Sequence, residues 1–228
     1  QGVFINIAIE QHAAPLAKLE AGFAEFATGL AKAFAAEADL AKPSPLEVNP
    51  LDKNAIVDWL EANPNNIWAL NTTCANLVEE EKFLEAIPLL ERSIRLHPRQ
   101  RGSGSPYGML ARAHRALGQA EDELSVLEQW ATIEDAATKL YGRLMEIHAE
   151  RENWEAVDRL AKRFFSANPL SPIGHRFMAL TAQQTGNTAA TIRPLKRLLL
   201  LDPADPVDLH FRLATALAGP SPLEAKRH

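Results

Sequence analysis

Arginine is the residue of this chain whose type and spacing are best suited to chemistry. At least one arginine falls in each of four successive amphipathic segments, although the formal net charge of the chain is −5. A guanidinium group holds a carboxylate through two parallel hydrogen bonds, so this row predicts a surface for an acidic peptide or a free carboxyl terminus. The alternative is a solvated face whose charges pair locally, such as Arg143 with Glu146. The row consists of Arg112, Arg143, Arg176 and Arg212.

The groups that usually carry catalysis or bind metals are few and isolated. Cys74 is the only cysteine, which excludes an intrachain disulfide and a cysteine-rich zinc site, and no base accompanies it. No His-Glu-x-x-His motif occurs, and the nearest approach to a metal cluster is His148 with Glu146 and Glu150. His148 and Glu150 point in different directions on a helix. The sequence therefore predicts no catalytic residue, no metal and no cofactor.

Composition limits the remaining classes of protein. The 228 residues are 46% hydrophobic and 23% charged, which is ordinary for a soluble globular protein. The acidic balance argues against a nucleic-acid binder, which needs basic residues to neutralise phosphates. No apolar run approaches the roughly 20 residues that span a bilayer. A protein or peptide partner is the expectation that remains, and no feature indicates a cellular compartment.

The elements that would position the arginines repeat with a fixed period. Pro64 and Pro98 are 34 residues apart, and so are Pro169 and Pro203. The interval between Pro98 and Pro169 is 71, two such units plus three residues, and the glycine-rich loop 101–105 accommodates the excess. This period is typical of a solenoid of stacked helix pairs. The predicted units are 67–100, 104–137, 138–171, 172–205 and a partial fifth at 207–228.

The first 45 residues differ from the repeats. Apolar residues at steps of three and four predict a helix from Ala14 to Ala36, whereas the apolar run 4–10 fits a helix or a strand. Three prolines within 42–50 then break the chain, and 55–60 predicts a short helix. We therefore expect a helical segment, 1–45, that ends an upstream domain, and a solenoid over 46–228. Both ends read as the interior of a longer protein.

The units resemble tetratricopeptide repeats (TPRs) in one shared register. The matching residues of unit one are Leu70, Cys74, Leu77, Phe83, Ala86, Leu90 and Pro98. Those of units two to four include Tyr107, Leu110, Ala111, His114, Gly118, Tyr141, Leu144, His148, Trp154, Phe164, Pro169, Met178, Ala179, Gly186, Leu195 and Pro203. Glu123 departs from the small residue expected at position 20, and Asp135 replaces a proline. The resemblance implies an all-α, right-handed solenoid of helix-turn-helix repeats, with unit-one helices at 67–79 and 83–96.

The resemblance also implies where a partner binds, because first helices line the concave groove of such solenoids. We therefore expect a non-catalytic protein-interaction scaffold that holds a peptide or partner domain in this groove. The family's clamp of lysines and asparagines for carboxylates is not reproduced. The candidate groove residues are Trp68, Asn71, Arg112, Arg115, Arg143, Arg176, Phe211 and Arg212.

A second resemblance supplies the alternative function. A helix, a proline-rich break and degenerate repeats in this order are similar to the tail of large bacterial proteins that carry a metallopeptidase-like domain upstream. In that case the repeats are a structural arm or lid of a larger enzyme and have no specific ligand. The stretch 213–218 lacks a following helix of full length, so we also expect an apolar patch there that is open to self-association.

Overall fold

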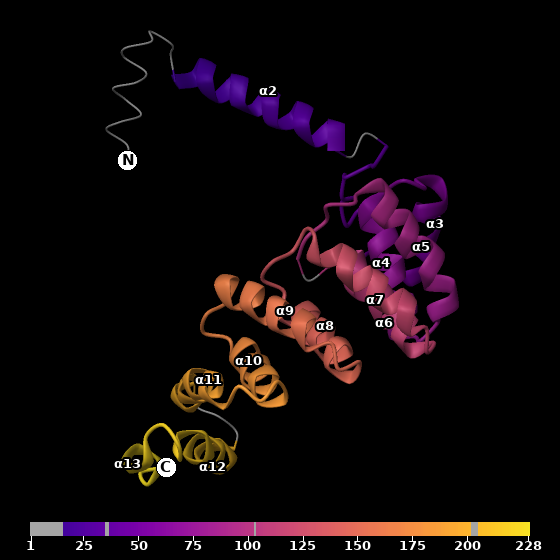
Figure 1. Ribbon diagram of the computed structural model, residues 1–228. Coiled ribbons are helices and arrows are strands. Elements are labelled where there is room, and N and C mark those ends of the chain that lie inside the picture. The colour runs from indigo at the N-terminus through magenta and orange to yellow at the C-terminus, as the bar shows by residue number, and fades with distance from the viewer. Residues whose placement is uncertain (1–15, 35–36, 103, 202–204) are drawn as a thin grey trace. The chain divides into compact units, whose positions relative to one another are not determined.

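The computed structural model describes residues 16–34, 37–102, 104–201 and 205–228. Every regular element in these ranges is a helix (Figure 1), and their one isolated β-bridge joins Asp39 to Asn66. The predicted all-α fold is confirmed. The run 4–10, which was expected to be helix or strand, lies outside the described residues. The chain divides into two compact units, residues 1–100 and residues 101–228.

The first unit contains four of the described helices, and three of them form a packed group. Helix α3 packs on α4, and α4 packs on α5. One cluster of their buried core consists of Leu60, Ile67, Ala69 and Leu70. Phe23 and Phe26 of α2 are exposed. The bounds of α4 and α5 coincide with the ranges expected for unit one. The four helices are α2 (Leu16–Phe34), α3 (Lys53–Ala62), α4 (Ile67–Glu79) and α5 (Phe83–Leu96).

Asn66 joins the proline-rich segment to the start of α4. Its Oδ1 accepts a hydrogen bond from the backbone N–H of Ala69 at 2.9 Å, which caps the helix. Its Nδ2 donates to Asp39 Oδ2 at 2.6 Å and to the carbonyl of Ala41 at 2.8 Å. The bond from Asn66 lowers the pKa of Asp39. One buried amide therefore fixes both the helix start and the chain that approaches it.

The second unit contains four successive helix pairs, of which the last is shortened. Each helix packs on the next along the chain, and α8 also contacts α10, so first helices of adjacent repeats are neighbours. This stacking is that of a solenoid. The helices are α6 (Pro106–Ala116), α7 (Ala120–Ala131), α8 (Thr138–Glu150), α9 (Trp154–Ala167), α10 (Pro172–Gln184), α11 (Thr188–Leu200), α12 (Pro206–Leu217) and α13 (Pro222–Ala225).

The turn inside each helix pair has the same geometry in four repeats. The residue at position 15 adopts a left-handed backbone conformation, with φ of +71° at Gly118 and +73° at Gly186. Glutamates take the same conformation in the other two repeats, with φ of +58° at Glu81 and +55° at Glu152. In each turn the next residue donates to a carbonyl five residues back, as Gln119 does to His114 at 2.9 Å. This is a Schellman motif, which favours glycine because a Cβ atom is strained there.

The predicted apolar patch at 213–218 is not exposed. Leu213 and Leu217 are buried in a cluster with Leu195, Leu198 and Leu209, and Ala225 packs against the same cluster. The short helix α13 contacts α12 and adds Ala225 to this cluster. The prediction was wrong because α11 together with the one-turn helix α13 covers these leucines.

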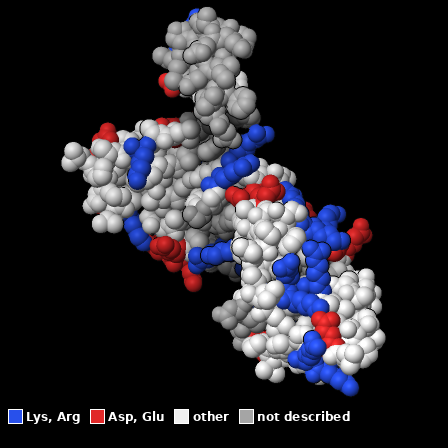
Figure 2. All heavy atoms as spheres, turned by 90° about the vertical axis from the view of Figure 1, so that its left-hand side faces the viewer, with Lys and Arg blue, Asp and Glu red and all other residues white. Residues whose placement is uncertain are grey.

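Charge is distributed unevenly over the second unit. Figure 2 shows Lys and Arg side chains gathered over the lower part of the picture, where α9 to α13 lie, with Asp and Glu side chains less frequent there. This distribution differs from the acidic balance of the whole chain.

Candidate functional site

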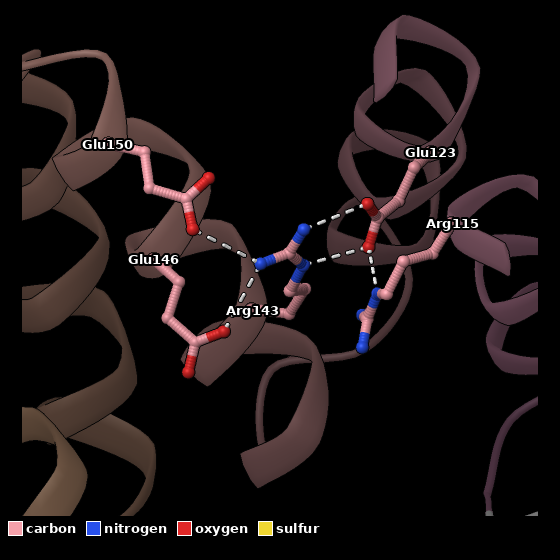
Figure 3. A network of polar contacts seen from close by, with 5 residues as sticks. All are labelled: Arg115, Glu123, Arg143, Glu146 and Glu150. Carbon is pink, nitrogen blue, oxygen red and sulfur yellow. Dashed lines mark hydrogen bonds and ion pairs between the residues drawn. The ribbon is translucent and has the colours of Figure 1, made fainter. Parts of the chain in front are cut away.

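Arg143 lies at the centre of a network of five charged side chains (Figure 3). Its Nε and Nη2 donate to the two carboxylate oxygens of Glu123, at 2.9 and 3.0 Å, and form a bidentate pair. Arg115 Nε donates to the same Glu123 at 2.7 Å. On the other side of Arg143, Nη1 lies 3.4 Å from Glu146 and 3.5 Å from Glu150. The network therefore joins α6, α7 and α8, which belong to two successive repeats.

Glu123 is the buried member of this network. It occupies the position that holds buried Ala86 in unit one and buried Val157 in unit three, and only 1% of its surface is exposed. Burial by itself raises the pKa of Glu123, but the hydrogen bonds from Arg143 and Arg115 outweigh it, and the net pKa lies below the ordinary value. The bond to Glu123 raises the pKa of Arg143. Both groups are therefore ionised at neutral pH.

The sequence signalled Glu123 only as a departure from the repeat pattern. Arg143 is 20 residues further along the chain, and the local pairing considered for it in the sequence was with Glu146. The structure shows that Glu146 is the more distant contact and that the bidentate partner is Glu123. A charged residue at a small, buried repeat position is the signal that could have identified this pair, because a buried carboxylate requires a cationic partner.

The other arginines of the row differ from Arg143. Arg112 and Arg176 are exposed and make no hydrogen bond or ion pair with any residue that the structure describes. Arg212 Nη1 lies 3.5 Å from Asp208, and its Nη2 donates to Gln183 of α10 at 3.3 Å. This last contact joins a side chain of α12 to one of α10, which are the first helices of successive repeats. Phe211, adjacent to Arg212 in sequence, is 72% exposed.

Trp68 and Asn71 lie in the first unit, on α4. Trp68 is half-buried and packs against the core of that unit. Asn71 Oδ1 accepts a hydrogen bond from the buried Ser93 Oγ at 2.7 Å, which joins α4 to α5. Both residues therefore make contacts that hold their own repeat together.

The row thus separates into engaged and free arginines. Arg115 and Arg143 meet at Glu123, Arg212 contacts Asp208 and Gln183, and Arg112 and Arg176 contact none of the described charges. Free, exposed guanidinium groups can bind a carboxylate from outside the chain without breaking an internal bond. Arg112 and Arg176 are therefore the members of the row whose guanidinium groups make no bond to a described residue.

The isolated catalytic candidates are packed into the fold. Cys74 is fully buried, and burial raises the pKa of its thiol to about 12. His114 is buried and its Nδ1 lies 2.8 Å from Gln119 Oε1. Burial also lowers the pKa of His148.

Among the described residues, no three His, Cys, Asp or Glu side chains group together as a metal site. None of the described helices combines the length and the apolar character that crossing a membrane requires.

No protein-family model matches the chain, and no curated protein matches it. Several solved structures are similar to it. YrrB, described as "a TPR protein with an unusual peptide-binding site", aligns with a TM-score of 0.59 at 11% identity over 76% of this chain and 88% of that chain. A tetratricopeptide repeat protein from Parabacteroides merdae aligns with a TM-score of 0.55 at 15% identity, covering 77% and 68% of the two chains.

The MamA protein is a further match, with a TM-score of 0.54 at 16% identity over 66% of this chain and 80% of that chain. At these identities the likeness concerns the fold. The TPR-like fold inferred from the repeat register is therefore confirmed. None of the three structures bears on the resemblance to proteins with a metallopeptidase-like domain.

Proposed function

We propose that the chain is a non-catalytic interaction scaffold that binds a peptide or partner domain along its first helices. The TPR fold supports this proposal, because helix-pair solenoids present extended surfaces for peptide segments. YrrB, which has the same fold, is described as having a peptide-binding site. The observation that carries the proposal is a pair of exposed side chains, Arg176 on α10 and Phe211 on α12, neither of which has a polar or aromatic partner among the described residues.

The chemistry of this pair favours an acidic or carboxyl-terminal ligand. Arg176 supplies a free guanidinium group, and Phe211 supplies an aromatic surface on the next first helix. Arginine and large aromatic side chains are the types that most often dominate binding energy at protein interfaces. Arg112 on α6 adds a second free cation further along the unit. We give Arg143 a structural role and not a ligand-binding one, because its guanidinium group already binds the carboxylate of Glu123.

A peptide titration tests this proposal. The probe is a labelled acidic peptide that ends in a free carboxylate, compared with the same peptide carrying a carboxyl-terminal amide. We expect Arg176→Ala and Phe211→Ala each to weaken binding by about tenfold, since a charge-assisted bond or a buried aromatic contact is lost. Arg95→Ala, which removes an exposed arginine from α5, is the matched control and leaves the affinity unchanged. Equal affinities for all three variants would refute a first-helix groove.

The engaged arginines favour a second candidate function. Arg115 and Arg143 hold two repeats together through Glu123, which is what a stiff structural arm requires. In that case the repeats are an arm or lid of a larger enzyme and the first helices carry no ligand. The same titration distinguishes the two functions, because an arm without a ligand binds neither the peptide with a free carboxylate nor its amide.

A further inference from the structure

The segment 159–201 has a charge unlike that of the rest of the chain. Its 43 residues contain seven arginines or lysines and no aspartate or glutamate, so the remaining residues carry 17 basic and 29 acidic side chains. The segment runs from α9 through α10 to the end of α11. A basic region of this kind attracts anionic ligands from solution. The arginine row on the first helices contributes only Arg176 to it.

Six of the seven basic residues recur at the 34-residue period on the two second helices. Arginines or lysines that occupy equal repeat positions lie on equivalent faces of α9 and α11, and residues four apart share one side of a helix. Lys162, Arg163 and Lys196 form ion pairs with Asp158, Asp135 and Glu224. The other three, Arg159, Arg193 and Arg197, are exposed and have no ion pair or hydrogen bond among the described residues. The equivalent pairs are Arg159 with Arg193, Lys162 with Lys196, and Arg163 with Arg197.

An apolar pocket of about 460 Å³ lies beside the free arginines of α11. Arg193 and Arg197 line it together with apolar side chains from α9, α10, α11 and the loop that joins α9 to α10, and none of the described residues that line it is acidic. Its volume is in the range of sites that hold small ligands or anchoring side chains. The apolar lining includes Phe165, Leu170, Met178 and Leu200.

His175 fixes one wall of the pocket. The imidazole is buried, its Nε2 lies 3.1 Å from the carbonyl oxygen of Pro169, and its ring meets the edge of Phe165 at 5.1 Å between centroids. These contacts connect α10 to the loop that carries Leu170. Leu170 and Leu200 remain 78% and 75% exposed, respectively, although both line the pocket. The pocket is therefore shaped by buried contacts and open to a partner.

We propose that this surface is a second docking site, which binds an acidic peptide segment by inserting one large apolar side chain into the pocket. Carboxylates that flank the inserted side chain would pair with Arg193 and Arg197, and Arg159 on α9 extends the same charge. The free arginines of the site lie on the second helices α9 and α11, and the first helix α10 contributes His175 and Met178 to the pocket wall. Nucleic acid and anionic membranes would also satisfy the arginines. We favour a peptide because an acidic segment with one large apolar side chain matches both the arginines and the volume of the pocket beside them.

A competition between matched peptides tests the proposal on the full chain. The probe is a fluorescein-labelled peptide with a central phenylalanine between runs of aspartate and glutamate, and its partner peptide has alanine in place of phenylalanine. We expect Arg193→Glu with Arg197→Glu to weaken binding of the phenylalanine peptide by at least about tenfold. Replacing the phenylalanine of the probe, or making Leu200→Ser, weakens binding by about fivefold or more.

Two control variants show whether a loss of binding is specific to this surface. Arg112→Glu makes a charge reversal on an exposed, unpaired arginine of α6 and leaves the affinity of this peptide within about twofold, because α6 lies outside the basic segment. Arg176→Ala weakens the binding of a first-helix ligand and leaves the binding of this peptide unchanged.

The altered residues are exposed, so circular dichroism shows the same helicity and melting temperature in each variant. Equal affinity for the phenylalanine and alanine peptides, or tighter binding of duplex DNA or phosphatidylserine vesicles than of the peptide, overturns the proposal.

Discussion

We expect Arg143→Ala to destabilise the folded chain more than Glu123→Ala does. In Arg143→Ala the carboxylate of Glu123 stays buried and loses both bonds of the bidentate pair, retaining only Arg115, whose side chain is half-exposed. Breaking a buried pair from one side usually costs about 3–5 kcal/mol, and the remaining bond from Arg115 places this case near 3 kcal/mol.

The reverse substitution, Glu123→Ala, leaves no buried charge. Arg143 is already 21% exposed and lies within reach of Glu146 and Glu150, so its charge is accommodated. Alanine is also the residue that the repeat carries at the equivalent position 86. The loss is then the net value of the hydrogen bonds and a small cavity, about 1–2 kcal/mol.

The double variant gives the decisive comparison. Once Arg143 is absent, removing Glu123 eliminates the orphaned carboxylate, so the double variant is expected to be at least as stable as Arg143→Ala alone. The coupling energy between the two sites is then at least about 1–2 kcal/mol. Urea unfolding followed by circular dichroism and tryptophan fluorescence measures all four proteins, and Arg112→Ala is the matched control, with a change within about 0.5 kcal/mol. Additive single effects, or a larger loss for Glu123→Ala than for Arg143→Ala, would contradict this account of the buried pair.

Three further predictions concern the pH dependence, the turns and the thiol. Because the folded pKa of Glu123 lies below its unfolded value, its contribution is complete above pH 4.5 and is lost as pH falls through the folded pKa, so the stability advantage over Glu123→Gln shrinks in acid titrations. Gly186→Ala should lower the free energy of unfolding by about 1 kcal/mol. Its added Cβ meets no atom within 4 Å, so the cost is conformational, whereas Glu152→Gly should raise that free energy, and thermal melts compare both. Cys74, with a thiol pKa of about 12, should react with iodoacetamide at pH 8 only after denaturation, as mass spectrometry would show.

The sequence predicted the helices well because the signals that end them are local. Proline follows the cap of α5 at Pro98 and of α9 at Pro169, and glycine marks the turn at Gly118 and Gly186. Such residues restrict the backbone in any context. The bounds of α4 and α5 were therefore correct to the residue.

The partners of individual side chains were harder to predict because they depend on packing between repeats. Arg143 and Glu123 belong to different helix pairs, and the sequence around each residue does not indicate the other as its partner. The pocket beside Arg193 and Arg197 was missed for a related reason. Its walls come from three helices and a loop, and the repeat pattern drew attention only to the arginines on first helices.

The Glu123–Arg143 pair also limits how freely these repeats can be exchanged. In an array of equivalent units, any one could be deleted and the ends rejoined. Deleting 138–171 here would instead place Phe177 at the repeat position of Arg143, opposite a carboxylate that keeps only Arg115. Units two and three are thus matched to each other, and a shortened chain would need a small, neutral residue at 123 before its new neighbours could pack.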